Sequence, residues 1–591
     1  MRLTRIRHAI LLVLLVAAPA HAAERDVVRQ AMEDELARSM ASLRMESLEK
    51  PYFISYRVDE TVNLSVGATF GSLTGSDLTR GRRLTVELRV GERGFDNTNY
   101  FAMTRSMFLG GGQQARLPLE DDYREIRRAI WLATDAAYKD ALETLAKKRA
   151  TLQNKTRPEE LPDFAEQTPA QVFDAPPGPP PDRGPLEALV RDLSKLFRTM
   201  PQVSSSAVSL EWSSTYTRYV NSEGTRFARS EPEVDFVVRA RSFASDGLPL
   251  RDFTAFFARD LAGLPPRERL AESVRALGER LAALQKAPLL ETYNGPVLFE
   301  GEAAAELWSQ VMAPALAASR RPVTENPQLD ALFQRQGSLS DKIGARVLPR
   351  FLSVVDDPTR SRAGAEILLG GYSVDDDGVP ASSCVLAESG LLTGLLATRD
   401  PAPGALKSNG HRRGSEAVPS NLIVTASASL ADRDLRRKLL ELAKANGLPY
   451  ALIVRRISDP LLLPEQLTPA AMMAMFGVGG ESQPLPPVIA AYELLPDGRE
   501  QLVRNVQITG IGTGAFKDIV AVSAAPTTTT LPFGAGGSVA AAVRRIAGGS
   551  SGALPLISVV TPSLLFEEAT LKKPVEEVPK PPVAKHPYFA K

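Results

Sequence analysis

The pattern of hydrophobic residues changes near residue 290, and this change sets the broad architecture. Before it, long amphipathic stretches alternate with strand-like runs, whereas after it most of the chain is typical of short strands and turns. Glu120–Asn154 carries its apolar residues on one helical face, and Leu84–Val90 alternates as in a half-buried strand. We therefore predict an α+β chain of two domains. Residues 23–290 would hold a mixed sheet with long helices, and residues 291–570 would be rich in strands.

The same patterns predict further elements. Helices are expected at Glu24–Met45, Leu186–Arg198, Pro266–Gln285, Ala303–Ala318 and Asp432–Ala445. A strand is also expected at Tyr52–Val58. A β-hairpin is predicted where Ala490–Leu495 and Gln501–Thr509 flank a Pro-Asp-Gly turn.

Residues able to bind a soft metal or form a disulfide are scarce. The 591 residues include 4 His and 1 Cys, Cys384. A single Cys excludes an intramolecular disulfide framework, a four-Cys zinc site and an iron–sulfur cluster. The chain also lacks a phosphate-binding loop and a dinucleotide fingerprint, and its formal net charge of +1 gives no basic field for nucleic acid. We therefore expect no cofactor, no metal and no nucleic-acid partner.

Residues 1–22 have the three parts of a secretory signal peptide. Three Arg precede an apolar run, Ala9–Ala18, and Ala20-His21-Ala22 supplies the small residues of a cleavage site. The apolar run is shorter than the ~18–20 residues that cross a bilayer, which argues against a membrane anchor. We expect cleavage after Ala22, export to the periplasm or the medium, and no transmembrane segment in the mature chain.

Two Pro-rich stretches lie outside the predicted helices and strands. The first, at about residues 155–185, culminates in Ala175–Pro181. We interpret it as a stiff, partly polyproline II insertion at the surface, with recognition by a Pro-binding module as the alternative. The second, residues 571–591, has too little apolar content to fold alone and predicts a disordered tail.

Two short motifs suggest chemistry but have simpler explanations. Gly548–Gly552 matches the Gly-x-Ser-x-Gly nucleophile elbow, whose Ser must follow a strand and precede a helix. Here a helix-like run comes before and a strand-like run after, which favours a flexible Gly/Ser loop. Asp375-Asp376-Asp377 could suggest calcium, but an EF-hand loop needs acids at alternate positions and a Glu at the twelfth. We interpret this run as a solvated turn ending in Gly378-Val379-Pro380.

His411 is the only His that lies neither in the first 22 residues nor in the C-terminal tail. As a general base it would need an acid or hydroxyl partner, which the sequence does not show. The preceding Asn409-Gly410 pair is typical of a turn, so we expect His411 to be a polar loop residue. Arg412 and Arg413 could still hold a carboxylate or a peptide terminus.

Seven segments between Tyr293 and Phe566 resemble, in their order, the TldD/PmbA family, known as metallopeptidases related to a modulator of DNA gyrase. The segments are Gly295–Leu307, Val354–Asp357, Val374–Pro380, Glu388–Gly394, Ser408–Arg412, Pro419–Asn421 and Pro562–Leu564. The resemblance implies the two-domain fold of that family. In the first half it is fainter, and the Pro-rich insertion departs from the family pattern.

Catalytic members of this family carry His-Glu-x-x-x-His on the helix after the Gly-Pro-Val strand, where two His bind the metal and the Glu activates water. On this sequence the motif falls on Trp308–Ala313. Trp308 and Ala313 stand at the ligand positions and Ser309 at the position of the general base. The late Cys ligand of the family is also missing from Gly548–Leu556. The resemblance therefore implies that the family's hydrolytic mechanism is lost.

This pattern resembles the PmbA side of the family, whose members lack the ligands and pair with a catalytic TldD-type subunit. It implies an exported, non-catalytic protein that binds a peptide or a partner, as a homodimer or as a heterodimer with a TldD-type subunit. The candidate peptide-binding residues are Asn409, Gly410, His411 and Arg412. Two alternatives stay open: an active peptidase with a relocated site around His411, Ser408 and nearby Asp residues, and a purely structural envelope protein.

Overall fold

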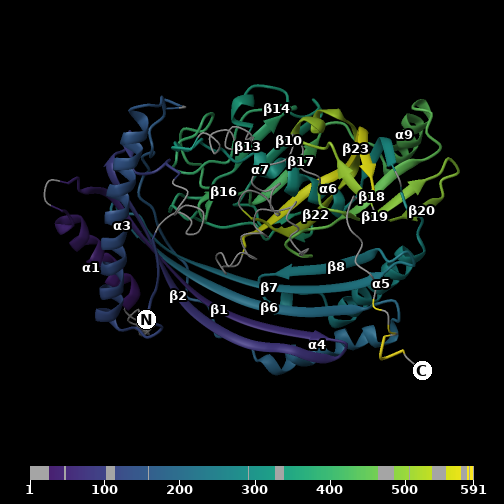
Figure 1. The fold of residues 1–591 in the computed structure, drawn as a ribbon, viewed down its shortest axis with the longest axis horizontal. Coiled ribbons are helices and arrows are strands. Elements are labelled where there is room, and N and C mark those ends of the chain that lie inside the picture. The colour runs from purple at the N-terminus through teal and green to yellow at the C-terminus, as the bar shows by residue number, and fades with distance from the viewer. Residues whose placement is uncertain are drawn as a thin grey trace, which may run out of the picture.

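The chain forms two sheet-based domains that lie against one another in the computed structural model (Figure 1). The described residues are 26–589 without 46–47, 102–112, 158, 291, 327–338, 464–484, 505, 535–553, 574–581, 583 and 585. The predicted boundary near residue 290 lies between helix α5 (Arg267–Lys286) and strand β9 (Thr292–Phe299). The predicted α+β class is confirmed. The predicted leader, 1–22, and the Gly548–Gly552 motif lie outside the described residues.

An eight-stranded sheet, antiparallel except at β5, forms the N-terminal domain. Its order is β3-β2-β1-β6-β7-β5, with β4 beside β2 and β8 beside β7. The strands are β1 (Pro51–Thr69), β2 (Ser72–Glu92), β3 (Phe95–Asp96), β4 (Gln113–Arg116), β5 (Gln171–Phe173), β6 (Ser205–Asn221), β7 (Arg226–Phe243) and β8 (Pro249–Ala258). The long strands β1, β2, β6 and β7 give this sheet its curved, extended shape (Figure 1).

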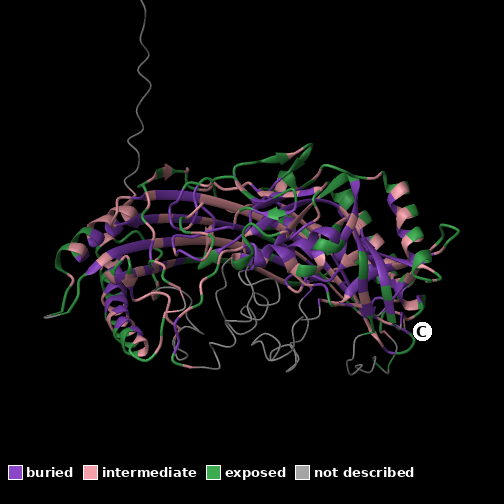
Figure 2. Ribbon diagram, turned by 90° about the horizontal axis from the view of Figure 1, so that it is seen from above, coloured by how far each residue is buried: buried purple, intermediate pink, exposed green. Residues whose placement is uncertain are grey.

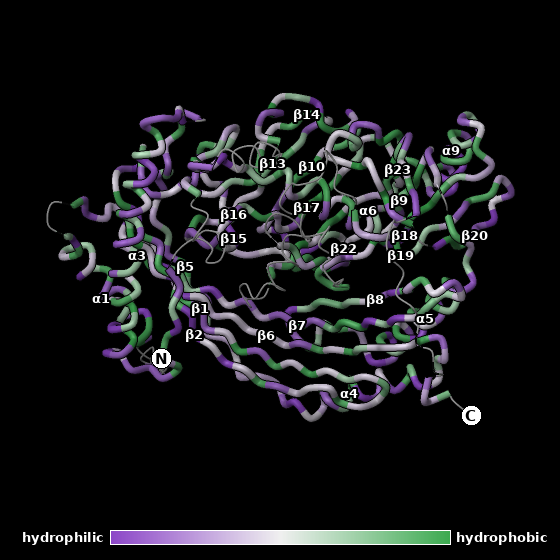
Figure 3. The backbone as a smooth tube through the Cα atoms, viewed as in Figure 1, coloured by the Kyte–Doolittle hydropathy of each residue, from purple (hydrophilic) through white to green (hydrophobic). Residues whose placement is uncertain are grey.

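Four helices cover one face of this sheet. They are α1 (Val27–Ser42), α3 (Tyr123–Leu152), α4 (Arg183–Lys195) and α5. Because side chains alternate along a strand, Ile54 and Leu64 of β1 both face the helices. Ile54 lies in the core under α1 and α3, and Leu64 lies in the core under α4 and α5. The same alternation sends Phe53 and Arg57 to the opposite face, which meets the C-terminal domain. Figure 3 shows the resulting alternation of hydropathy along the strands.

An eleven-stranded sheet forms the C-terminal domain, in the order β14-β13-β10-β17-β23-β9-β18-β19-β20, with β21 and β22 also beside β23. Its strands are β9, β10 (Leu352–Asp356), β13 (Cys384–Glu388), β14 (Leu391–Leu392), β17 (Asn421–Ala426), β18 (Ala451–Ile457), β19 (Val488–Leu494), β20 (Glu500–Val503), β21 (Gln507–Thr509), β22 (Ile519–Pro532) and β23 (Leu556–Lys572). Val297 and Phe299 of β9 face the main core, whereas Leu298 faces helix α9 (Asp432–Ala445). Figure 2 shows buried residues running along these strands.

Most predicted elements are confirmed, with two differences in extent. Helix α9 has the predicted bounds, and Gly447 after it takes a φ of 70°, as a helix C-terminus favours. The helix expected at Ala303–Ala318 is shorter and irregular, ending at Ala315. β1 runs eleven residues beyond the predicted Val58, because β2 and β6 pair with it along its polar half.

The Pro-rich insertion is only partly the surface spacer that its composition predicts. Its Pro run, 176–181, has no buried residue, but β5 pairs with β7, and Asp163 and Phe164 are buried. The surface interpretation is therefore wrong for Asp163, which binds Lys148 at 2.6 Å, and for Phe164, whose partners are described below.

At the other end of the chain, His586 and Tyr588 of the predicted tail lie against Phe70, with ring centroids 5.3 and 5.4 Å away.

Across the described ranges, no helix combines the length and apolar character needed to cross a membrane.

Candidate functional site

The helix after β9 carries the three residues at the family's catalytic positions. It comprises α6 (Glu302–Leu307), a π-helical turn (Trp308–Met312) and α7 (Ala313–Ala315). Pro314 has no N–H and cannot continue a regular ladder of hydrogen bonds. Ala313 N–H bonds instead to the Trp308 carbonyl, five residues back. The turn that should present the catalytic motif is thus distorted along its whole length.

Trp308, Ser309 and Ala313 are buried in the main core rather than displayed in a cleft. Trp308 and Ala313 are 0 % exposed and Ser309 is 3 % exposed. The Trp308 ring packs edge-on against Phe516, with centroids 5.0 Å apart. Its indole N–H has no hydrogen-bond partner among the described atoms, which is costly for a buried donor. At these three positions the helix is therefore packed into the hydrophobic core.

The metal of the family does not fit this donor set. Zinc in proteins takes thiolate, imidazole or carboxylate ligands, and an indole, a methyl group and a hydroxyl replace them here. Over the part of the chain that the structure describes, no three His, Cys, Asp or Glu side chains gather at metal-binding distance. No hydrolytic step through a bound metal can be derived from these positions.

Two buried carboxyl groups that the sequence analysis did not single out lie close together here, Glu306 on α6 and Asp459 in the loop after β18. Gln310 Nε2 donates to Glu306 Oε2 at 2.7 Å and to the Ser458 carbonyl at 3.1 Å, tying the helix to the loop after β18. Burial, and then the nearby Asp459, raise the pKa of Glu306 well above its ordinary value. Burial raises the pKa of Asp459 to about 7. Near neutral pH this pair can hold a proton, and a single sequence gives no signal for such long-range proximity.

His411 lies in a loop, as predicted, and its side chain is fully buried. Its Nε2 lies 3.0 Å from Asp356 Oδ1, and its Nδ1 lies 2.9 Å from Asn409 Oδ1 and 3.0 Å from the Asn409 carbonyl. The Asn409 amide is oriented by Ala397 N–H, which donates to Oδ1, and by the Leu395 carbonyl, which accepts from Nδ2. Every ring contact of His411 is therefore with an oxygen acceptor, as a structural cross-link requires.

Among the described residues, no hydroxyl or thiol group forms a hydrogen bond with the His411 ring. Ser420 directs both its hydroxyl and its N–H to Asp356, the acid that also holds His411. Ser408 Oγ, the predicted neighbour, bonds to the Ala397 carbonyl and accepts from Gly410 N–H. Cys384 lies 3.3 Å from Asn409 Nδ2, and burial raises the pKa of its thiol to about 11, which disfavours the reactive thiolate. The predicted residues are thus brought together, but not in the order that nucleophilic catalysis needs.

Gly410 is fixed in this loop by its backbone. Its φ is 78°, and a Cβ there would lie 2.4 Å from the Pro380 carbonyl. Only glycine fits both constraints. The loop Ser408–Arg412 is therefore packed closely against Pro380, the last residue of the family segment Val374–Pro380.

The acidic run Asp375–Asp377 forms a turn, as predicted, but the turn is not solvated. Asp376 accepts from Arg229 Nη2 at 2.6 Å and from Arg57 Nη1 at 2.9 Å, both on the N-terminal sheet. Burial alone would raise the pKa of Asp376, but Arg229, Arg57 and Arg413 outweigh it and hold that pKa below its ordinary value. The prediction failed because Arg229 and Arg57, which bind Asp376, lie more than a hundred positions away in the sequence.

Arg412 belongs to the same interdomain cluster. Its Nη1 binds Asp377 Oδ1 at 2.8 Å, and its Nη2 lies 3.5 Å from Glu87 of β2. Arg413 Nη2 binds Glu231 of β7 at 2.5 Å. The two guanidinium groups that could have held a peptide carboxylate are engaged with carboxylates of the protein itself.

Phe164 of the Pro-rich insertion lies between two arginines from different domains. The Arg89 guanidinium carbon is 3.8 Å from the ring centroid, and that of Arg399 is 3.9 Å away. Arg89 also binds Asp400 at 2.7 Å across the domain boundary. Cation–π contacts of this kind are strongest where water is excluded, and through them the insertion packs against arginines of both domains.

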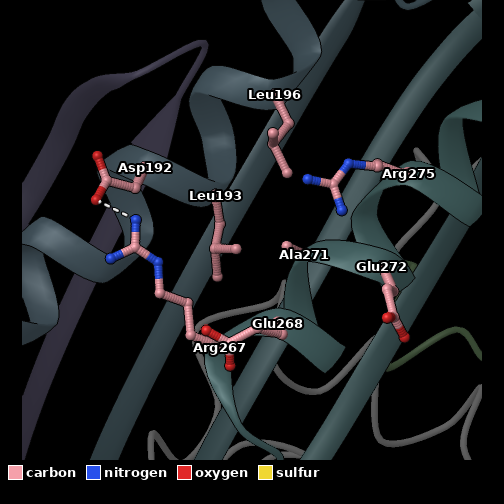
Figure 4. A pocket seen from close by; sticks show the side chains of 8 residues that line it. All are labelled: Asp192, Leu193, Leu196, Arg267, Glu268, Ala271, Glu272 and Arg275. Atoms are coloured by element: carbon pink, nitrogen blue, oxygen red, sulfur yellow. Dashed lines mark hydrogen bonds and ion pairs between the residues drawn. The ribbon is translucent and has the colours of Figure 1, made fainter.

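A shallow pocket of about 300 Å³ lies on the helix layer of the N-terminal domain (Figure 4). It opens between α4 and α5 and is lined by both signs of charge, including Arg275 and the ion pair of Arg267 with Asp192 at 2.7 Å. It lies on the opposite face of the sheet from the interdomain cluster and contains none of the predicted site residues.

Known proteins identify this scaffold. The model of the PmbA/TldA metallopeptidase C-terminal domain matches residues 292–442, which include the helix after β9, the acidic turn and the His411 loop. Residues 292–442 therefore form a C-terminal domain of the TldD/PmbA family. A metalloprotease of Methanothermobacter thermautotrophicus is 27% identical over 205 residues, covering 34% of this chain and 40% of the relative. A metalloprotease of Methanocaldococcus jannaschii is 32% identical over 90 residues, covering 15% of this chain and 19% of the relative. The matches thus span less than half the length of these curated relatives.

Solved structures confirm the TldD/PmbA-like fold over both domains. TldE from Thermococcus kodakarensis superposes with a TM-score of 0.55 at 14% identity, covering 92% of this chain and 99% of that chain. A candidate modulator of a DNA gyrase from Thermotoga maritima MSB8 gives a TM-score of 0.53 at 14% identity, covering 88% and 96%. The family fold therefore extends through the N-terminal half, where the sequence resemblance is faint.

Proposed function

We propose that this TldD/PmbA-family protein is a non-catalytic subunit that binds a peptide or a partner after export from the cytoplasm. The observation that carries this proposal is the packing of Trp308, Ser309 and Ala313 at the catalytic positions. A hydrophobic core fills the place of two metal ligands and a general base. Hydrolysis by the family's mechanism needs an open coordination position, and these side chains supply neither ligand nor opening.

Export is proposed on the sequence of residues 1–22 alone, and cell fractionation with N-terminal sequencing tests it. We expect the mature protein outside the cytoplasm, beginning at Ala23. A full-length protein confined to the cytoplasm would contradict export while leaving the subunit role untouched.

The partner is either a second copy of this chain or a TldD-type subunit. The fold likeness to a protein named TldE supports this proposal, as does the absence of the ligands. A direct test compares peptide hydrolysis by the purified protein, by a purified TldD-type subunit from the same cell, and by their mixture. We expect no hydrolysis by the protein alone. Hydrolysis by the protein alone that chelation abolishes and zinc restores would overturn the non-catalytic role.

One observation favours a second candidate, a peptidase with its site around His411. The His411–Asp356 pair has the contact of a base and its orienting acid, 3.0 Å apart. Its burial and the engagement of Ser420 with Asp356 argue against it. His411→Ala distinguishes the candidates, because it would abolish any activity of such a site but would only destabilise a structural cross-link.

A further inference from the structure

The free edge of β2 is a part of the N-terminal sheet where a new strand could add. β1 pairs with β2 along its length, while on the other side β4 pairs with Arg83–Val86 and β3 with Gly91–Glu92. Within the described residues, no strand lies beside Gly75–Gly81 on that second side. This segment contains neither Pro nor Lys, two common protections of sheet edges.

Both ends of this open segment are well defined. At one end, Thr74 is the extra residue between the pairs Ala68–Leu73 and Gly67–Gly75, so a β-bulge interrupts the edge there. At the other end, the Arg82 carbonyl accepts from Leu117 N–H, and its side chain binds Asp121 at 2.9 Å. Seven regular residues with Leu78 at their centre remain open.

The sequence of the open segment is complementary to itself. If two copies pair antiparallel around Leu78, the two Leu78 residues lie opposite one another and Gly75 lies opposite Gly81. Leu78 is 39 % exposed in a single chain, and in this pairing Leu78 of the second copy would cover it. Asp77 would lie opposite Thr79, so no like charges face each other, and opposed side chains stabilise a sheet.

Charge complementarity also favours a second copy. Three residues of the open segment lie on the face of the sheet that the helices cover. They are Ser76, Leu78 and Arg80, which pair with Val66, Leu64 and Val62 of β1, and these three residues of β1 pack under α4. In the symmetric pairing, Arg80 of one copy lies opposite Ser76 of the other. Ser76 Oγ donates to Glu187 Oε1 of α4 at 2.7 Å. Arg80 is exposed, has no ion pair among the described side chains, and would reach this carboxylate.

We propose that β2 joins two copies of this chain into a homodimer by antiparallel pairing of Gly75–Gly81, with an ion pair between Arg80 and Glu187 of the other copy repeated by symmetry. The eight-stranded sheets of two protomers become one continuous sheet. This inference rests on the proposed function only for the expectation of assembly, and it does not depend on the missing catalysis.

The test measures the molar mass of the purified protein by light scattering across a dilution series. We expect the wild type to have twice the mass of one chain. Arg80→Glu, which places Glu beside Glu187, should raise the dimer dissociation constant about tenfold. The double variant Arg80→Glu with Glu187→Arg should restore it. Arg275→Glu is the matched control, because it makes the same charge change on α5, which packs on β7 and β8 away from this edge.

A cross-link locates the contact independently of affinity. In a Cys384→Ala background, Leu78→Cys should form a covalent dimer on mild oxidation, because opposed Cβ atoms of paired strands lie about 4.5–5.5 Å apart. Arg275→Cys in the same background should not. A monomeric wild type, a dimer that neither responds to Arg80→Glu nor cross-links at residue 78, or assembly only with a TldD-type subunit would each overturn the proposal. None of these results would bear on peptide hydrolysis.

Discussion

The helix after β9, called here the catalytic helix because catalytic members of the family carry their motif on it, and the loop around His411 lie in the same domain. The first holds mainly apolar side chains at the motif positions, whereas the second holds polar ones. Trp308, Ser309 and Ala313 put hydrophobic packing where the family's catalytic members place metal ligands and a base. The loop Ser408–Arg412 keeps its polar residues, and two of them are bound by other family segments, His411 by Asp356 and Arg412 by Asp375. In this chain the two regions therefore differ in kind. The residues at the catalytic positions are packed into the core, whereas His411 and Arg412 connect distant segments of the chain.

The polar set is organised around links between segments far apart in the chain. Asp356 joins Ser420 to His411, and Asn421 Nδ2 donates to the Asp357 carbonyl at 3.0 Å. Asp375 Oδ2 accepts from Arg412 N–H at 3.1 Å. These contacts explain why the segments stay recognisable in a chain whose catalytic helix has changed, because removing one partner would leave another buried without a bond.

The largest expected effect comes from removing the centre of the interdomain cluster. Asp376→Asn leaves Arg229 and Arg57 without their shared carboxylate, and breaking a buried ion pair in this way costs about 3–5 kcal/mol. We expect a loss of that size in the free energy of unfolding, measured in urea. Asp434→Asn on the exposed side of α9 is the control and should change it by less than about 0.5 kcal/mol. Equal effects of the two would contradict the structural role of the cluster.

Two substitutions at Trp308 test the apolar character of the catalytic helix. Trp308→His puts a small polar ring into the core and should cost about 3 kcal/mol. Trp308→Phe removes an indole N–H that has no partner and should cost about 1 kcal/mol. Thermal unfolding of both variants in the presence and absence of zinc gives the comparison. A histidine variant that zinc stabilises more than it stabilises the phenylalanine variant would show that a ligand position is still accessible.

At the polar loop, His411→Ala is expected to reduce stability by about 2 kcal/mol, because it leaves the buried Asp356 without one of its donors. Ser408→Ala, in the same loop but with a partly exposed hydroxyl, should cost less than about 1 kcal/mol. Urea denaturation of the pair measures the difference. If His411→Ala left the free energy of unfolding unchanged, the contact between His411 and Asp356 would not stabilise the fold.

The smallest effect is a pH dependence at Asp459 beside the catalytic helix. Its pKa is raised to about 7 in the folded protein, whereas an unfolded Asp ionises near pH 4. The folded state therefore binds more protons than the unfolded state between these values, so this group lowers stability as pH rises from about 4 to about 7. Asp459→Asn should flatten that decline, measured by urea unfolding at several pH values, whereas the exposed Glu416→Gln should leave it unchanged. A steeper decline in the Asn variant would reverse the assigned direction.

The sequence predicts local features well and long-range ones poorly. The bounds of α9, the hairpin β19–β20 and the amphipathic α3 follow from spacing and turn residues within the segments themselves. The solvated turn at Asp375–Asp377 was wrong because its arginine partners lie on β1 and β7. The absence of ligands at Trp308–Ala313 was readable from the motif, but the π-helical turn and the buried Glu306–Asp459 pair required the assembled fold.

Zinc content of the purified protein tests the central claim most directly. The protein would be incubated with excess zinc, passed through a desalting column and measured for metal per chain, with a TldD-type family member that carries His-Glu-x-x-x-His treated in parallel. Because Trp308, Ser309 and Ala313 offer no ligand, we expect far less than one zinc per chain, against about one for the comparison protein. One zinc per chain, retained on the column and lost on chelation together with peptide hydrolysis, would contradict the account.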